Sequence, residues 1–206
     1  MFICVHLWFQ ILKKNASVKV VNASKAELRR TLLKLRQSMP VEDWREKSDR
    51  ICSHLQSTPL FTQARTVLAY FSVRQEPDLS LLFTDSKHRW GFSRVQGKSL
   101  SWHSWQPGEP LQTGAYGIFE PQPEASALQP TEVDLILVPA VACDRRGDRL
   151  GYGGGFYDRM LSSAEWASKP TIGIVFEFAY LPRLPIDDWD KVLQGVCTET
   201  GFNRVE

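Results

Sequence analysis

The chain has 206 residues, 43% of them hydrophobic and 23% charged, and its formal net charge is +2. This length suits one domain with a substantial buried core. So small a net charge, with no dense run of Lys and Arg, argues against a nucleic-acid partner. The four cysteines lack C-x-x-C spacing and the four histidines form no metal-ligand pattern, so we expect reduced thiols in a cytoplasmic protein and no structural zinc.

Residues 1–23 differ from the rest of the chain, and we expect them to form a poorly ordered extension of a domain in residues 24–206. Residues 2–12 are apolar, but Lys13 and Lys14 follow this stretch, whereas a secretory signal carries its positive charge first. The stretch is too short to span a bilayer, so we expect no membrane partner. An interfacial anchor or an organelle address is the alternative.

Two helices are predicted at the start of the domain. Ser24 and Glu27 have the spacing of a capping box. Apolar residues then recur at helical spacing, at Leu28, Leu32 and Leu35. Pro40 ends this first helix. A second helix is predicted over residues 42–56, with one apolar side that comprises Trp44, Ile51 and Leu55.

Short apolar or alternating segments predict six strands, at residues 66–71, 89–95, 100–105, 133–139, 171–176 and 192–198. A helix is predicted around residues 79–83, and the proline- and glycine-rich residues 106–130 are expected to be mostly loop. Strands that alternate with helices predict a single α/β domain. Its sheet would be open and mostly parallel with helices on both faces, a three-layer, Rossmann-like arrangement.

Four glycines gather in residues 151–155, the glycine loop, which Arg149 and Asp158 flank. The loop follows an apolar strand-like run, residues 133–141, and precedes a helical segment. This arrangement would present backbone N–H groups and a positive helix end to a phosphate, with Arg149 as a charged fork and Asp158 as a Mg²⁺ ligand. The spacing is neither that of a Walker A loop nor G-x-G-x-x-G, and a tight turn that requires positive φ is the structural alternative.

Ligands of open α/β sheets bind beyond the carboxyl ends of the strands, which directs attention to two further segments. Glu76 follows the predicted strand 66–71, and Asp190 ends the acidic segment 185–190. By position alone, Glu76 would be a solvated carboxylate, and the aspartates would cap or solubilise a turn.

Five short segments occur in an order and spacing that resemble one enzyme family. They are Lys-Ala-Glu-Leu-Arg at 25–29, Tyr-Phe-Ser-Val-Arg-Gln-Glu at 70–76, Gly-Ala-Tyr-Gly-Ile-Phe-Glu-Pro at 114–121, Asp-Leu-Ile-Leu-Val-Pro at 134–139, and Gly-Asp-Arg-Leu-Gly-Tyr-Gly-Gly-Gly-Phe-Tyr-Asp at 147–158. Over residues 24–200 the chain is similar to 5-formyltetrahydrofolate cyclo-ligase, also called 5,10-methenyltetrahydrofolate synthetase.

The resemblance implies a monomeric enzyme that uses ATP and Mg²⁺ to close a ring, converting 5-formyltetrahydrofolate to 5,10-methenyltetrahydrofolate with release of ADP and phosphate. In this family the γ-phosphoryl group passes to the formyl oxygen, N10 attacks the activated carbon, and phosphate leaves. A formyl oxygen is a poor leaving group until it is phosphorylated, so the protein would contribute mainly positioning and charge stabilisation.

The resemblance also implies the site residues. The ATP-binding set is Lys25, Ala26, Glu27, Leu28, Arg29, Arg149, Leu150, Gly151, Tyr152, Gly153, Gly154, Gly155, Phe156 and Tyr157. The folate-binding set is Phe71, Glu76, Tyr116, Tyr152, Gly153, Gly154, Gly155 and Phe156. The metal ligands are Asp158 and Asp190, and the catalytic residues are Arg149, Tyr157 and Asp158. Lys25 and Arg29 stand four residues apart, so both cations share one helical face and can reach the same polyphosphate.

The chain departs from the family at three of these positions. Several members carry basic residues where this chain has Tyr152 and Gly154, and Phe156 replaces a frequent tyrosine.

Two other function classes are alternatives. One is a sugar-phosphate isomerase or acyl-CoA transferase relative, which would share the fold without needing ATP, and the second is a nucleotide- or RNA-binding module. The second rests on the aromatic residues Trp90, Trp102 and Trp105, which we expect instead to fill the sheet's core or edge.

Overall fold

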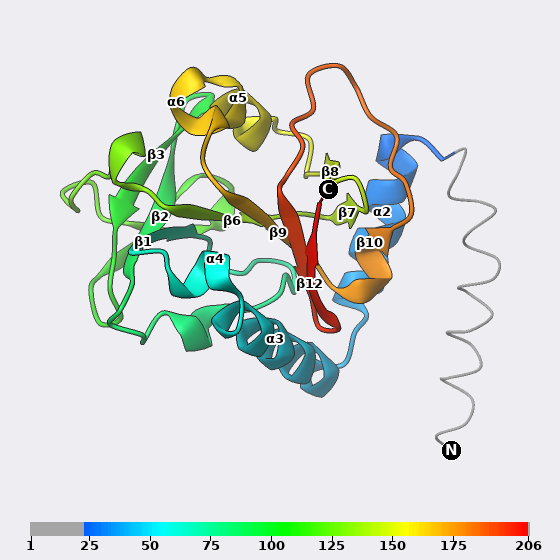
Figure 1. Ribbon diagram of the computed structural model, residues 1–206, viewed down its shortest axis with the longest axis horizontal. Helices are drawn as coiled ribbons and strands as arrows, with labels where there is room; N and C mark the ends of the chain where they lie inside the picture. Colours follow the sequence, from blue (N-terminus) through cyan, green and yellow to red (C-terminus); the bar gives the residue numbers. More distant parts are fainter. Residues whose placement is uncertain (1–22, 206) are drawn as a thin grey trace.

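A computed structural model describes residues 23–205. Its centre is a seven-stranded sheet in the order β12-β11-β9-β6-β1-β2-β3 (Figure 1). The strands are β1 (Thr66–Ala69), β2 (Arg89–Gln96), β3 (Ser99–Ser104), β6 (Leu135–Pro139), β9 (Thr171–Ile174), β11 (Gly195–Thr198) and β12 (Gly201–Arg204). The five inner strands run parallel, and β3 and β12 are antiparallel at the two edges. The predicted open, mostly parallel sheet is therefore confirmed. The expected extension lies outside the described residues, apart from Ala23.

Helices lie on both faces of this sheet, which gives the predicted three layers (Figure 1). They are α2 (Lys25–Gln37), α3 (Val41–Gln56), α4 (Pro59–Thr62), α5 (Phe156–Ser162) and α6 (Ala164–Ala167). Side chains of β6 alternate between two hydrophobic cores, as a strand buried on both faces requires. Ile136 and Val138 pack with α2 and α5, and Leu135 and Leu137 pack with α3 and α4.

The two N-terminal helices begin and bury their faces as the sequence predicts. The Ser24 side chain accepts a hydrogen bond from the Glu27 N–H, and the Glu27 carboxylate accepts one from the Ser24 N–H, so both halves of the capping box are present. Leu28 and Leu32 are buried on α2, and Ile51 and Leu55 are fully buried on α3. The capping box therefore fixes the start of α2, while burial of one apolar face stabilises both helices.

Two sequence expectations are corrected. Residues 79–83 form a single 3₁₀ turn, η2 (Ser80–Leu82), because Pro77 and the short connection to β2 leave no room for a longer helix. Residues 106–130 are mostly loop, as expected, and include a small hairpin of β4 (Leu111–Thr113) and β5 (Phe119–Pro121) with the 3₁₀ turn η3 (Ala115–Gly117) between them; the 3₁₀ turn η4 (Pro130–Glu132) follows.

The second correction concerns the glycine loop, which does not follow the central strand directly. After β6 the chain makes a second hairpin, β7 (Ala142–Asp144) and β8 (Arg149–Leu150), and the glycine loop leaves from β8. β10 (Tyr180–Leu181), which follows the 3₁₀ turn η5 (Glu177–Ala179), pairs with β7 to complete a separate three-stranded sheet. This small sheet carries the glycine loop toward α2 (Figure 1).

Two tryptophans and three cysteines of residues 23–205 are buried. Trp90 and Trp102 are each 2% exposed, so they belong to the core and offer no platform for stacked bases. Cys52, Cys143 and Cys197 are buried free thiols, and burial raises the pKa of each to about 12. The helices of this part of the chain are all too short or too polar to cross a bilayer.

Candidate active site

The N-terminal half of α2 lies against the glycine loop. Arg29 Nε donates a hydrogen bond of 2.6 Å to the Gly151 carbonyl, across 122 positions of sequence. The Arg29 guanidinium also borders Gly153, where an added Cβ would be 3.8 Å from Arg29 Cζ. The structure therefore brings together the two segments that the resemblance assigns to ATP.

Two glycines of the loop have backbone conformations that other residues rarely adopt. Gly153 has φ of 100° and Gly155 has φ of 65°, in the left-handed region that a Cβ disfavours. Gly155 stands directly before α5 as its N-cap residue. The tight turn, the structural alternative for this loop, is thus present. The same loop also contacts a cation of α2, Arg29.

Arg149 and Asp158 close the loop from its two sides. Arg149 Nη2 lies 2.5 Å from Asp158 Oδ1, and the guanidinium sits over the Tyr157 ring at 5.6 Å from the centroid. Only 7% of Arg149 is exposed, and its Nε is buried without a hydrogen-bond partner among the described residues. Burial raises the pKa of Tyr157 well above its ordinary value, so its hydroxyl stays protonated. A buried N–H with no partner in the chain is available to a ligand atom.

The segment after β1, residues 70–77 (the β1 loop), holds Phe71 and Glu76. Phe71 is half-buried and stacks on Phe92, with ring centroids 4.2 Å apart and an interplanar angle of 10°. Glu76 is 2% exposed, and its Oε2 accepts a hydrogen bond from the Val73 N–H at 3.1 Å. The expectation of a solvated carboxylate is therefore wrong for Glu76, because the loop folds back and encloses it.

Burial raises the pKa of Glu76, and the nearby Arg36 guanidinium opposes this shift without cancelling it. Two residues just before it, Arg74 and Gln75, have φ of 49° and 55°. Non-glycine residues in this region store conformational strain, which structures tolerate mainly at functional sites. The loop is held in this shape by hydrogen bonds to α2 and to the turn that follows it: Arg36 Nε of α2 donates to the Arg74 carbonyl, and the Gln75 amide donates to the Met39 carbonyl at 3.1 Å.

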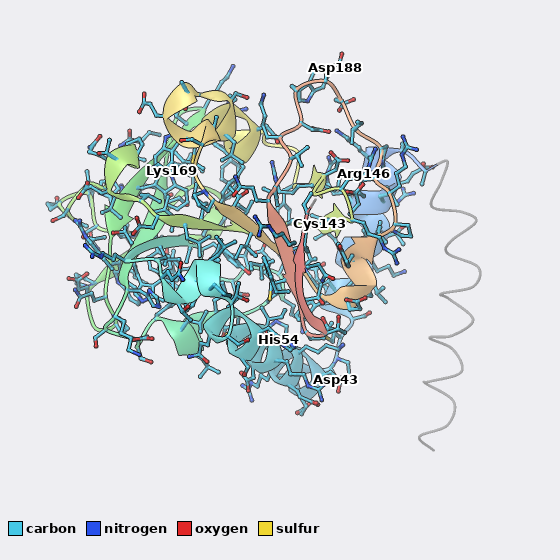
Figure 2. The ribbon with its side chains drawn as sticks, viewed as in Figure 1. Asp43, His54, Cys143, Arg146, Lys169 and Asp188 are labelled. Atoms are coloured by element: carbon cyan, nitrogen blue, oxygen red, sulfur yellow. The ribbon has the colours of Figure 1, made fainter. Side chains whose placement is uncertain are left out.

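A long loop between β10 and β11, residues 182–194 (the C-terminal loop), meets the first turn of α2. Figure 2 shows Asp188 at its tip. Lys25 Nζ lies 2.6 Å from Asp187 Oδ2 and forms a second ion pair with Asp190. Burial lowers the pKa of Lys25, but the hydrogen bonds to both carboxylates outweigh it and raise the pKa overall. The acidic segment is thus more than a solvating turn, because it tethers this loop to α2.

The two candidate metal ligands are each engaged with a cation, Asp158 with Arg149 and Asp190 with Lys25. No group of three or more His, Cys, Asp or Glu side chains within residues 23–205 is arranged to hold a metal ion by itself. Mg²⁺ commonly binds through one or two carboxylates together with substrate phosphates and water. The carboxylates present fit that kind of site and do not form a metal cage made of protein alone.

Tyr116 lies at the tip of the β4–β5 hairpin, residues 111–121 (the flap). It is 76% exposed and has φ of 64°, and its ring stands edge-on to Phe156 at a centroid distance of 6.1 Å. Beneath the flap, Glu120 is buried and accepts a hydrogen bond of 2.9 Å from the Val95 N–H of β2. Tyr116 is therefore a surface residue that faces the start of α5, not a core aromatic.

Sequence reasoning missed Arg36, which is 3% exposed in the last turn of α2 and joins the β1 loop to the glycine loop. A signal was available. Position 36 continues the apolar face of Leu28 and Leu32 at intervals of four residues, so helical spacing alone places this charge in the interior.

Comparison with known proteins agrees with the geometry. A profile of the 5-formyltetrahydrofolate cyclo-ligase family matches residues 21–199. The 5-formyltetrahydrofolate cyclo-ligase of Mycolicibacterium smegmatis is 33% identical over 186 residues, which cover 85% of this chain and 93% of the relative. The corresponding Escherichia coli K12 protein is 25% identical over 173 residues, covering 79% and 93%.

Solved structures agree as well. The NMR structure of Aquifex aeolicus 5,10-methenyltetrahydrofolate synthetase is similar to this chain with a TM-score of 0.79 and 34% identity, covering 88% of this chain and 93% of the other. A Mycoplasma pneumoniae 5,10-methenyltetrahydrofolate synthetase shares the fold at 18% identity, with a TM-score of 0.69 and coverage of 86% and 99%. Because the profile spans most of the domain and these relatives are covered nearly end to end, the chain belongs to the 5-formyltetrahydrofolate cyclo-ligase family of ligase enzymes.

Proposed function

We propose that the protein catalyses the ATP-dependent cyclisation of 5-formyltetrahydrofolate to 5,10-methenyltetrahydrofolate, as a cytoplasmic monomer. The formyl oxygen attacks the γ-phosphorus of ATP, which breaks the bond to ADP and gives an N5-iminium phosphate. N10 then attacks the activated carbon and loses its proton, and the former formyl oxygen leaves within inorganic phosphate. Each product atom is accounted for by the two substrates.

The phosphate side of the proposed site comprises α2 and the glycine loop. Lys25, Arg29 and Arg149 are the cations that we assign to the polyphosphate. Arg29 contacts Gly151 of the glycine loop, Arg149 pairs with Asp158 just after it, and Lys25 pairs with Asp190 one helical turn before Arg29. The orphaned Arg149 Nε supports this assignment, since a phosphate oxygen would satisfy it. Tyr152 and Gly154 add no charge of their own, so charge stabilisation depends on these three residues.

The folate side comprises the β1 loop and the flap. Phe71 offers an apolar contact, Glu76 offers carboxylate oxygens that accept hydrogen bonds from the pterin, and Tyr116 offers an exposed ring for stacking. Phe156 stands edge-on to Tyr116, so the folate would lie between the flap and the start of α5. This arrangement brings the formyl group toward the glycine loop.

Asp158 and Asp190 are the residues that we assign to Mg²⁺, which supplies charge neutralisation between the transferring phosphates when it is bound. In the protein alone, Arg149 and Lys25 compensate these carboxylates. A divalent ion at these carboxylates would compensate their charge, and Arg149 and Lys25 would then be available to the polyphosphate.

The observation that carries the proposal is the meeting of the glycine loop with the β1 loop at Tyr152. The Arg74 guanidinium lies over the Tyr152 ring, 5.8 Å from its centroid, and Arg36 Nη2, which donates to the Tyr152 hydroxyl, lies 3.9 Å from Glu76 Oε1. A reaction that transfers a phosphoryl group from ATP to folate requires both substrates in reach of each other, and this contact joins the residues assigned to each.

The test is an assay of the purified protein with ATP, Mg²⁺ and 5-formyltetrahydrofolate, followed by the absorbance of the methenyl product. We expect product only when all three are present, with one ADP released for each ring closed. Folded protein that yields no methenyl product from authentic substrate would contradict the enzyme assignment, and product formed without ATP would contradict the phosphorylation step.

A further inference from the structure

Arg36 is a buried charge on the face of α2 that packs against the sheet, with 3% of the residue exposed. A guanidinium in the interior is costly unless its N–H groups are hydrogen-bonded. It therefore needs a specific set of acceptors, and those acceptors identify what it holds in place.

The acceptors come from three separate segments. Arg36 Nε donates to the Arg74 carbonyl at 3.1 Å, and Nη1 donates to the Ala140 carbonyl at 3.2 Å. Nη2 donates to the Tyr152 hydroxyl and lies 3.9 Å from Glu76 Oε1. One rigid guanidinium thus connects the β1 loop, the end of β6 and the glycine loop, and a planar fork fixes the directions of these bonds.

The Tyr152 hydroxyl can both accept and donate a hydrogen bond. A phenol has one proton to donate. Because the oxygen accepts from Arg36 Nη2, that proton is free for another acceptor, and the same Nη2 lies 3.9 Å from Glu76 Oε1. Glu76 Oε2 accepts a hydrogen bond from the Val73 N–H. The Arg36 guanidinium and the Val73 N–H therefore both restrict the rotation of the carboxylate.

We propose that Arg36 is a positioning residue for folate, which by its contacts with Glu76 and Tyr152 orients the Glu76 carboxylate toward the substrate and aligns the β1 loop with the glycine loop. This inference rests on the proposed function, since it assigns Arg36 a role on the folate side of the same site. Arg36 itself is enclosed by protein atoms and acts through Glu76 and Tyr152.

The first test compares Arg36→Gln and Arg36→Lys in steady-state kinetics with each substrate varied. We expect the folate KM to rise by about tenfold or more in both variants, the size expected when a charged hydrogen bond is lost, while the ATP KM changes by less than about twofold. Lysine keeps the charge but offers one compact cation in place of a fork. A wild-type folate KM in Arg36→Lys would overturn the inference.

The matched control is Arg30→Gln, an exposed arginine on the same helix, for which we expect wild-type constants. A purely structural role of Arg36 would instead lower the thermal midpoint and reduce kcat in proportion to the unfolded fraction, with both KM values unchanged. That result would also overturn the inference. A wild-type protein without activity contradicts the proposed function itself, so the two failures are distinguishable.

Tyr152→Phe keeps the inference testable if the Arg36 variants do not fold, because it removes only the hydroxyl of a residue that is 39% exposed. We expect a folate KM a few times higher than wild type, since Arg36 Nη2 loses the hydroxyl that holds it beside Glu76. In a double-mutant cycle, removal of the hydroxyl should have a smaller effect in Arg36→Lys than in wild type. An unchanged folate KM in Tyr152→Phe, or fully additive effects, would contradict the positioning role.

Discussion

Arg149 and Asp158 form an ion pair, Nη2 2.5 Å from Oδ1, that joins the strand before the glycine loop to the first turn of α5. The sequence led us to expect separate tasks for them, phosphate charge for one and metal binding for the other. The geometry makes them one unit in which each charge compensates the other. Substitution of either residue therefore also affects its partner.

We expect Arg149→Ala and Asp158→Ala each to lower kcat by about 100-fold or more, since removal of one preorganised charge-stabilising group typically has an effect of this size. Loss of one partner from a buried pair also lowers the free energy of unfolding, by up to about 3–5 kcal/mol. Urea unfolding of each variant should therefore be measured together with its kinetics. The control is Arg146→Ala, an arginine on the β7–β8 hairpin with 42% of its side chain exposed. Wild-type rates in either site variant would remove that residue from the mechanism.

Asp190 and Asp187 both bind Lys25, but we assign only Asp190 to Mg²⁺. The Asp190 side chain is 10% exposed and that of Asp187 is 42% exposed. Asp190→Asn should raise the Mg²⁺ concentration for half-maximal activity by about tenfold, since it removes one charged ligand. Asp187→Asn should leave this concentration within about twofold of wild type. Equal shifts in both variants would indicate that tethering of the C-terminal loop, and not metal binding, is affected.

Tyr116 and Phe119 are exposed aromatic residues on the same flap, 76% and 57% exposed, but only Tyr116 contacts Phe156. We expect Tyr116→Ala to raise the folate KM by about three- to tenfold, the loss of one stacked ring, with an unchanged ATP KM. Phe119→Ala should have wild-type kinetics. Both side chains are on the surface, so neither change should cost more than about 0.5 kcal/mol of stability. An unaltered folate KM in Tyr116→Ala would exclude this residue from the folate site.

Glu76 should make the stability of the protein depend on pH. Burial raises the pKa of this carboxyl above its ordinary value of 4.5 in the folded state, so the folded protein binds the proton more tightly than the unfolded chain does. The resulting stabilisation is fully present below about pH 4.5 and is lost as the pH rises through the raised folded-state pKa. Each unit of elevation corresponds to about 1.4 kcal/mol.

Glu76→Gln removes this titration. Relative to the wild type, the free energy of unfolding of the variant should therefore increase from about pH 4 to about pH 8, while its folate KM rises because a carboxylate acceptor is lost. Urea unfolding of both proteins at a series of pH values measures the difference. If the free energies of unfolding of wild type and variant differ by the same amount at every pH in this range, the direction of the pKa shift is contradicted.

The parts of the fold that depend on neighbouring residues in sequence were predictable. The capping box of Ser24 and Glu27, the apolar face of α3 and the central strand around Leu135 and Leu137 all appear where local spacing placed them. The β7–β8 hairpin was not predicted, because its strands are only three and two residues long. Strands this short carry no readable periodicity, and their pairing with β10 is set by the rest of the fold.

The α/β class, the glycine loop and the family resemblance can be read from the sequence, since each depends on residue types at short, fixed separations. Which charges meet depends on how the chain folds. Lys25 pairs with Asp187 and Asp190, Arg149 pairs with Asp158, and Arg36 lies buried against Tyr152. Such pairs form between segments far apart in the chain, and burial then sets their pKa values and strengths. Spacing within one helix places Arg36 in the interior, but it does not identify the partner of any of these charges.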